Sequence, residues 1–132
     1  MRVYDYEIEK PELLRRVKMI QQIAGVDTIQ SIDGIHKGMQ HYAFRNGSGM
    51  AFNVVAEKCL DITTLRYKGY VLNISGLGMM FTSGLYNAGN PNTDEDNIFH
   101  PPHGKIRFTP AQNTYTKQGF DGDNRYIMEC GG

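Results

Sequence analysis

The stretch MQHYAFRNGSGMAFNVVA, residues 39–56, decides the fold class of this chain. Asn46-Gly47 divides it into two arms, residues 39–45 and 49–56, with aromatic residues in both and two valines in the second. Asn and Gly accept the positive φ angles of tight hairpin turns, so Asn-Gly between two such arms favours an antiparallel hairpin. We therefore predict two paired strands here.

The same pattern continues on both sides of this hairpin. Lys68-Gly69 separates two further predicted strands and predicts a second hairpin, and Asp33-Gly34 and Asp121-Gly122 mark other turns. The predicted strands comprise residues 26–32, 39–45, 49–56, 60–67, 70–74, 104–111, 113–117 and 125–130. Short strands with frequent turns indicate a mainly β fold, an antiparallel β-sandwich.

One segment, residues 11–24, has the spacing of an amphipathic helix. Pro11 suits the first helical position, and Gly25 supplies a stop. Its aliphatic side chains fall on one face: Leu13, Leu14, Val17, Ile20 and Ile23. We predict a single N-terminal helix packed on the sheet, within one domain covering residues 1–132.

Composition excludes several classes of function. Fourteen Lys and Arg balance fourteen Asp and Glu, so no basic surface favours nucleic acid or an anionic membrane as partner. The first residues lack a signal-peptide core and no stretch is apolar for about 18 residues, which predicts a cytoplasmic protein. In that compartment Cys59 and Cys130 are expected to be free buried thiols.

Between residues 75 and 102 glycines, asparagines and acidic residues replace the alternation, which predicts a long functional or mobile loop. No nucleotide cofactor is expected, because Gly76-Leu77-Gly78 lacks both the dinucleotide-binding glycine pattern and a Walker lysine.

Two histidines stand where this loop ends, in His100-Pro101-Pro102-His103. The prolines fix the backbone between the imidazoles, and His103 stands at the entrance of a predicted strand, from which it could project into a cleft. A loop histidine bonded to a backbone carbonyl fits the same pattern. A metal site formed with His36 or His41 is a third possibility, although no carboxylate or cysteine stands at a recognised spacing.

Asp61 lies inside a predicted strand, next to apolar residues. A carboxylate there either interrupts the buried face and needs a partner or stands at its rim. Lys58 and Arg66 are the candidate partners.

Three groups of residues resemble one family. Residues 12–16 with 22–26 look like its opening helix and first strand, and residues 46–50 with Leu60-Asp61-Ile62 look like its hairpin and "LDI" motif. The most specific match comprises residues 80–89, 103–107 and 109–111. In order along the chain, these resemble the N-terminal portion of the DUF4432 branch of galactose-mutarotase-like (aldose 1-epimerase-like) proteins.

The resemblance implies a β-supersandwich whose concave face binds a monosaccharide or related polyol without a cofactor. In aldose 1-epimerases of this group, histidines protonate the ring oxygen while a glutamate removes the anomeric proton, which is general acid–base chemistry. The resemblance implies that His103 is the catalytic histidine. It also implies that substrate is bound by Lys58, Asp61, Asn87, His100 and Arg107. Lys58 and Lys105 replace family arginines, so the planar fork that grips hydroxyls is lost at both positions.

Family members are about twice as long, so the resemblance implies a truncated chain whose glutamate base would lie in a missing C-terminal half. Because the last predicted strand, residues 125–130, lacks an evident partner, a homo-oligomer is expected. Two alternatives stay open: a non-catalytic carbohydrate-binding or regulatory domain, and a metal-dependent β-barrel sugar isomerase.

Overall fold

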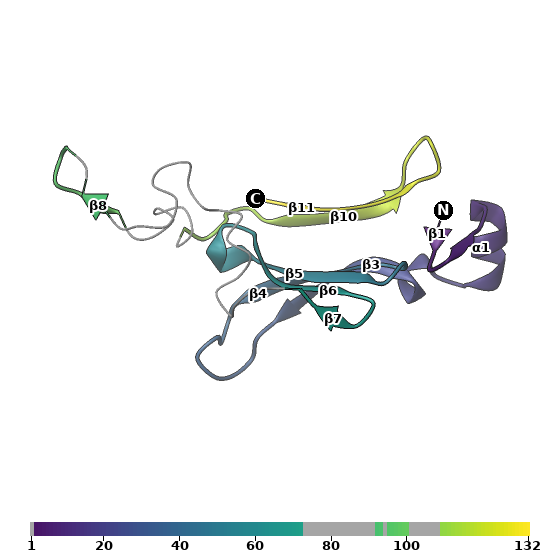
Figure 1. Cartoon of the computed structure of the whole chain (residues 1–132), viewed down its shortest axis with the longest axis horizontal. Helices are drawn as coiled ribbons and strands as arrows, with labels where there is room; N and C mark the ends of the chain where they lie inside the picture. Colours follow the sequence, from purple (N-terminus) through teal and green to yellow (C-terminus); the bar gives the residue numbers. More distant parts are fainter. Residues whose placement is uncertain (1, 73–91, 94, 101–108) are drawn as a thin grey trace.

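The computed structural model describes residues 2–72, 92–93, 95–100 and 109–132, and it is mainly β with one α-helix (Figure 1). All strand pairs in this part are antiparallel, which confirms the predicted fold class. The elements are β1 (Arg2–Val3), β2 (Tyr6–Glu7), α1 (Lys10–Arg16), η1 (Ile20–Gln22), β3 (Ala24–Gln30), β4 (Gln40–Asn46), β5 (Met50–Val55), η2 (Ala56–Lys58), β6 (Asp61–Tyr67), β7 (Tyr70–Val71), β8 (Asn92–Thr93), β9 (Phe99–His100), β10 (Tyr115–Phe120) and β11 (Tyr126–Gly131).

Strands β3 to β7 form a five-stranded sheet in chain order, and both predicted hairpins lie in it. In the β4–β5 turn, Gly47 and Gly49 take positive φ, while Asn46 Oδ1 accepts hydrogen bonds from the backbone N–H groups of Ser48 and Met50 at 2.8 and 3.0 Å. In the β6–β7 turn, Lys68 and Gly69 both have positive φ, the signature of a type I′ turn.

One face of this sheet forms the hydrophobic core. Residues that pair directly across antiparallel strands share a face, so Val26, Phe44 and Phe52 form one row. The rings of Phe44 and Phe52 stack with centroids 4.6 Å apart. A second row contains the buried Tyr42 and Val54.

The β10–β11 hairpin covers that face as a second layer, which Figure 1 shows lying along the sheet. Met128 and Cys130 pack against the core cluster. The amide of Gln118 joins the layers at the edge strand β3: its Oε1 accepts from Val26 N at 3.1 Å and its Nε2 donates to Val26 O at 3.4 Å. The two layers form the predicted sandwich.

The predicted helix of residues 11–24 is wrong in its second half. Helix α1 ends at Arg16, and Val17 is extended, with φ −119° and ψ 135°. The chain then forms the short η1, and Ala24 and Gly25 join β3, where they pair with Asn46 and Arg45. Strand pairing outweighs a helical pattern that β-branched Val17 supports only weakly.

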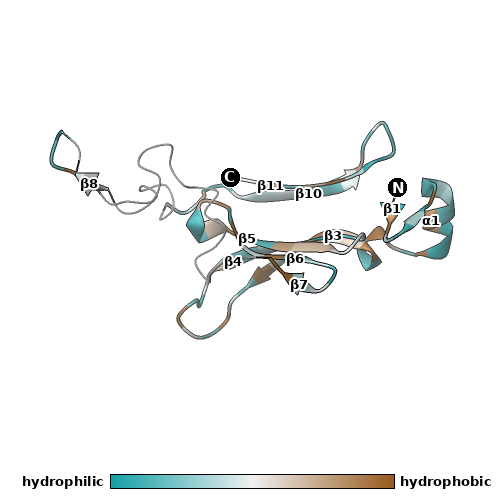
Figure 2. Ribbon diagram, viewed as in Figure 1, coloured by the Kyte–Doolittle hydropathy of each residue, from teal (hydrophilic) through white to brown (hydrophobic). Residues whose placement is uncertain are grey.

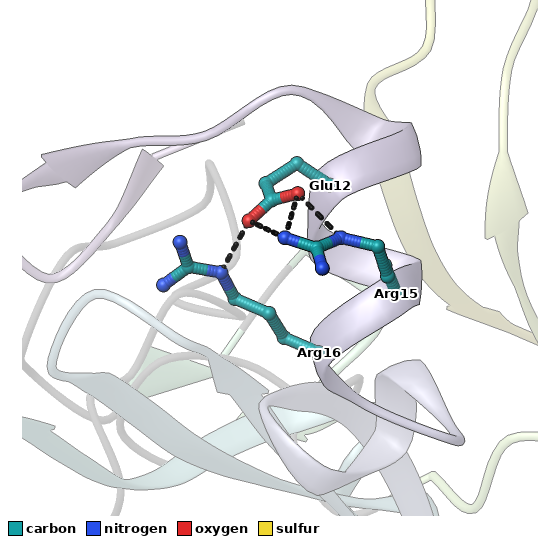
Figure 3. Close-up of polar contacts among 3 residues, drawn as sticks. All are labelled: Glu12, Arg15 and Arg16. Carbon is teal, nitrogen blue, oxygen red and sulfur yellow. Dashed lines mark hydrogen bonds and ion pairs between the residues drawn. The ribbon is translucent and has the colours of Figure 1, made fainter.

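Helix α1 is coloured mostly hydrophilic in Figure 2, and Leu13 is its buried residue. On its exposed side, Glu12 accepts hydrogen bonds from Arg15 Nε at 2.8 Å and Arg16 Nε at 2.6 Å (Figure 3). Such contacts three and four residues apart support a helix of only seven residues.

The C-terminal half differs from prediction in several places. Part of the predicted 75–102 loop forms the hairpin of β8 and β9. Residues 104–108 lie outside the described residues, and 109–111 form no strand. The predicted strand 113–117 is shifted to β10. The last strand was expected to lack a partner, but β11 pairs with β10 along its whole length. The Asp121-Gly122 turn brings these two strands together.

No helix in the described part of the chain has the length and apolar character needed to cross a membrane.

Candidate functional site

The second face of the five-stranded sheet is polar. Its side chains form three rows of directly paired residues, with the small residues Ala43 and Ala51 between larger polar ones. We call this surface the polar face, and its rows are Ile29, His41, Val55 and Asp61; Asp27, Ala43, Asn53 and Thr64; and Gly25, Arg45, Ala51 and Arg66. The hydrogen-bonding side chains in these rows make this face a candidate surface for a polar ligand.

A β-bulge in β6 creates this arrangement. The register with β5 shifts so that Val54 faces Ile62 and Asn53 faces Thr64, which leaves Thr63 as the extra residue. Without the bulge, Asp61 and Leu65 would share one face, because side chains alternate along a strand. The bulge lets Leu65 join the core side while Asp61 stays on the polar face. Bulges are over-represented beside active sites.

Asp61 is the one buried charged residue in the described part of the chain, with 2% of its surface exposed. Neither carboxylate oxygen has a hydrogen-bond partner among the described residues. Lys58 and Arg66, the partners expected from sequence, form no ion pair with it in that part of the structure. Burying an unpartnered carboxylate lowers the stability of the fold. The presence of Asp61 here is therefore better explained by a function than by stability.

The backbone immediately before Asp61 is strained. Cys59 and Leu60 have φ of 51° and 58°, a left-handed conformation that costs a non-glycine residue roughly 1–2 kcal/mol. Two consecutive residues of this kind turn the chain from η2 into β6 and bring Asp61 opposite Val55. Such strain tends to persist where the surroundings hold a functional conformation.

A pocket of about 140 Å³ opens next to this position. We call it the histidine pocket, and its walls are His36, Met39, His41, Val55, Lys58 and Thr63. Val55 also pairs with Asp61, so the pocket and the buried carboxylate belong to the same end of the polar face. Two imidazoles and an ammonium group there can donate hydrogen bonds and protons to an oxygen-rich ligand.

Neighbouring side chains hold the histidines in place. His41 Nε2 lies 3.1 Å from Ser31 Oγ, and His36 Nδ1 lies 3.1 Å from Met39 Sδ. Both oxygens of Glu57, in η2 next to Lys58, accept from the backbone N–H of Gln40, at 3.0 and 3.1 Å. The loop before β4 and the turn after β5 are thereby tied together around the pocket.

The structure places the sequence-predicted site residues unevenly. Lys58 lines the histidine pocket and Asp61 lies on the polar face. The backbone of His100 pairs with Asn92 in the β8–β9 hairpin. The remaining three, Asn87, His103 and Arg107, lie outside the described residues.

Sequence reasoning weighed His36 and His41 only as metal ligands and did not place them beside Lys58. The alternation in residues 39–45 puts His41 on the face opposite Tyr42, which is the signal that could have found it. No sequence pattern places His36 at the site, because it lies in the loop between β3 and β4, where side chains do not alternate between two faces.

In the described part of the chain no three His, Cys, Asp or Glu residues cluster closely enough to hold a metal ion. The sheets in the described part of the chain are open and do not close into a barrel. Cys59 and Cys130 are both free and half-buried, and burial, followed by the charge of Glu129, raises the pKa of the Cys130 thiol.

Comparison of the chain with protein-family models, with curated proteins and with solved structures found no match.

Proposed function

We propose that this chain is an aldose 1-epimerase-like protein that binds a monosaccharide or related polyol on the polar face of its five-stranded sheet. The observation that carries the proposal is the buried carboxylate of Asp61, which has no hydrogen-bond partner among the described residues and lies at the end of the face where the histidine pocket opens. A sugar hydroxyl that donates to Asp61 would offset the cost of burying the charge.

The composition of the polar face supports a ligand rich in hydroxyl groups. Asn53, Thr64 and Asp27 offer hydrogen-bonding groups of both kinds, and the alanines beside them permit close approach to the sheet. At about 140 Å³ the histidine pocket is smaller than the roughly 300 Å³ at which ligand pockets begin, so it would hold part of a sugar ring while the rest lies on the polar face.

Mutarotation needs one proton delivered and one removed. An acid protonates the ring oxygen as a base takes the proton of the anomeric hydroxyl, the ring C–O bond breaks, and reclosure on the other face returns both protons. By resemblance His103 is the acid. His41 and Lys58, which line the histidine pocket, would orient the sugar oxygens, and Asp61, which pairs with Val55 of the pocket wall, would accept from a hydroxyl.

The test measures anomer interconversion by NMR across a panel of aldoses for the wild type and for the His103→Ala and Lys58→Gln variants. Lys37→Gln is the matched control, since Lys37 is exposed in the β3–β4 loop and does not line the pocket. We expect acceleration by the wild type and the control, with the base supplied by another residue of this chain or by a second copy of it. We expect loss of acceleration in His103→Ala and a higher KM in Lys58→Gln.

Two other outcomes are informative. Saturable sugar binding without acceleration, weakened by Lys58→Gln, would establish the non-catalytic carbohydrate-binding alternative. Absence of both binding and acceleration in the wild type would refute the proposal. Metal analysis of the same purified protein addresses the metal-dependent isomerase.

A further inference from the structure

A larger pocket lies at the opposite end of the sheet, where two hairpin turns meet the N-terminal segment. Its volume is about 660 Å³, within the roughly 300–1,000 Å³ of small-molecule sites. We call it the turn pocket, and its walls include Tyr4, Asp5, Arg45, Gly49, Lys68 and Gly69. None of these residues lines the histidine pocket.

Among the described residues, the charges around the turn pocket do not balance. Lys68 Nζ and Arg2 Nη2 each lie 3.9 Å from the same oxygen of Asp5, which is beyond hydrogen-bond distance for both. Arg45 Nη2 contacts Asp27 Oδ2 at 2.9 Å. These three cations therefore share the carboxylates of Asp5 and Asp27. Of the two cations on the pocket wall, Lys68 is paired more weakly than Arg45.

The backbone of the pocket wall is held open and rigid. Gly49 and Gly69 have φ of 93° and 89°, so neither position readily takes a side chain that would fill the pocket. The backbone N–H of Lys68 donates to Gly49 O at 2.7 Å and locks the two turns together. The Lys68 ammonium is thereby carried on a fixed turn.

We propose that the turn pocket binds a small oxyanion, the phosphate or carboxylate group of a soluble molecule, through Lys68 and Arg45. The guanidinium of Arg45, whose Nη2 also contacts Asp27 Oδ2 and donates to Gln21 O, provides one positive charge, and the ammonium of Lys68 adds a second. The exposed ring of Tyr4 provides a surface for the body of such a molecule. Arg45 also belongs to the polar face, but Lys68 lies on neither the polar face nor the histidine pocket, so a Lys68 variant tests this site separately from the proposed sugar site.

The test uses inorganic phosphate as the probe, with sodium chloride at matched ionic strength as reference, followed through the backbone amide NMR signals of Gly47, Gly49 and Gly69. The decisive variant is Lys68→Asn, because asparagine tolerates the positive φ of this position and Asn-Gly is a preferred type I′ turn. It removes the charge without weakening the turn. Lys37→Asn removes an exposed lysine elsewhere and serves as its control.

We expect saturable shifts of these glycine signals with phosphate that chloride does not reproduce. Lys68→Asn should lower the affinity by about fivefold, equivalent to one ion pair, while Lys37→Asn leaves it unchanged. A parallel titration with acetate shows whether the pocket prefers phosphate or carboxylate. Shifts that chloride reproduces, or that Lys68→Asn and Lys37→Asn weaken equally, would overturn the proposal.

Discussion

Asp61 lies directly opposite Val55 across β5 and β6, and the two side chains are buried to nearly the same degree, with 2% and 1% of their surface exposed. An aliphatic side chain gains stability from that burial, whereas an unpartnered carboxylate loses it. The pair therefore marks a position where the protein carries a charge at the expense of stability.

The first prediction concerns the stability lost by burying the Asp61 carboxylate. Asp61→Asn should raise the free energy of unfolding by about 1 kcal/mol, because a neutral amide of the same shape avoids burying a charge, and it should abolish sugar binding. Urea denaturation measures the stability. Asp123→Asn is the control, since Asp123 lies away from the polar face and its exposed ion pair with Arg125 contributes at most about 1 kcal/mol. A clear loss of stability in Asp61→Asn would show that the carboxylate is paired in the folded protein.

The second prediction concerns the joint between the two layers. Gln118→Ala should lower the free energy of unfolding by about 1–3 kcal/mol, since both backbone groups of Val26 lose their side-chain partner. Lys117→Ala, one residue earlier and exposed, should change it by less than about 0.5 kcal/mol. Equal effects in urea denaturation would contradict a bridging role for Gln118.

The third prediction compares two glycines with nearly the same backbone. Gly34 and Gly47 have φ of 74° and 71°, but an added Cβ at Gly47 would lie 2.6 Å from Ile23 Cγ2, while at Gly34 it would meet nothing within 4 Å. Gly34→Ala should cost about 1 kcal/mol from backbone strain alone. Gly47→Ala should cost about 1–3 kcal/mol more from the steric overlap. Thermal unfolding of both variants checks the difference.

The fourth prediction concerns pH. Hydrogen bonds from Arg16, then Arg15, lower the pKa of Glu12 below the usual glutamate value (Figure 3). A carboxylate with a lowered folded-state pKa stabilises the fold above its unfolded-state pKa, and that contribution disappears as pH falls through the folded-state value. Carboxyl NMR titration should show the low midpoint. In Arg16→Gln it should rise; an unchanged midpoint would exclude Arg16 as the cause.

The fifth prediction concerns thiol reactivity. Because burial raises the pKa of Cys130, little thiolate is present at neutral pH, and alkylation should be slow in the folded protein and fast in denaturant. The rate should increase as pH rises. Mass-spectrometric mapping of iodoacetamide labelling over time measures it, and labelling of Cys130 at the same rate in folded and denatured protein would contradict its place in the core.

Several features of the fold could be predicted because short-range chemistry decides them. The β6–β7 turn follows from Lys68-Gly69 alone, with both residues at positive φ. The β4–β5 hairpin was also predicted, but Asn46 acts there through its side-chain oxygen rather than through positive φ of its own. The candidate site was predicted only in part, since Lys58 and Asp61 were selected by resemblance and neither His41 nor the β-bulge was connected with them.

The sequence by itself determined the strands and turns of the central sheet, because alternation and turn residues act within a few positions along the chain. Only the tertiary structure decided where the helix ends, since Ala24 and Gly25 pair with residues some twenty positions away. It likewise decided that Thr63 is the bulge and that Asp61 is buried on the polar face. Register and burial arise from contacts between distant segments, and no local pattern encodes them.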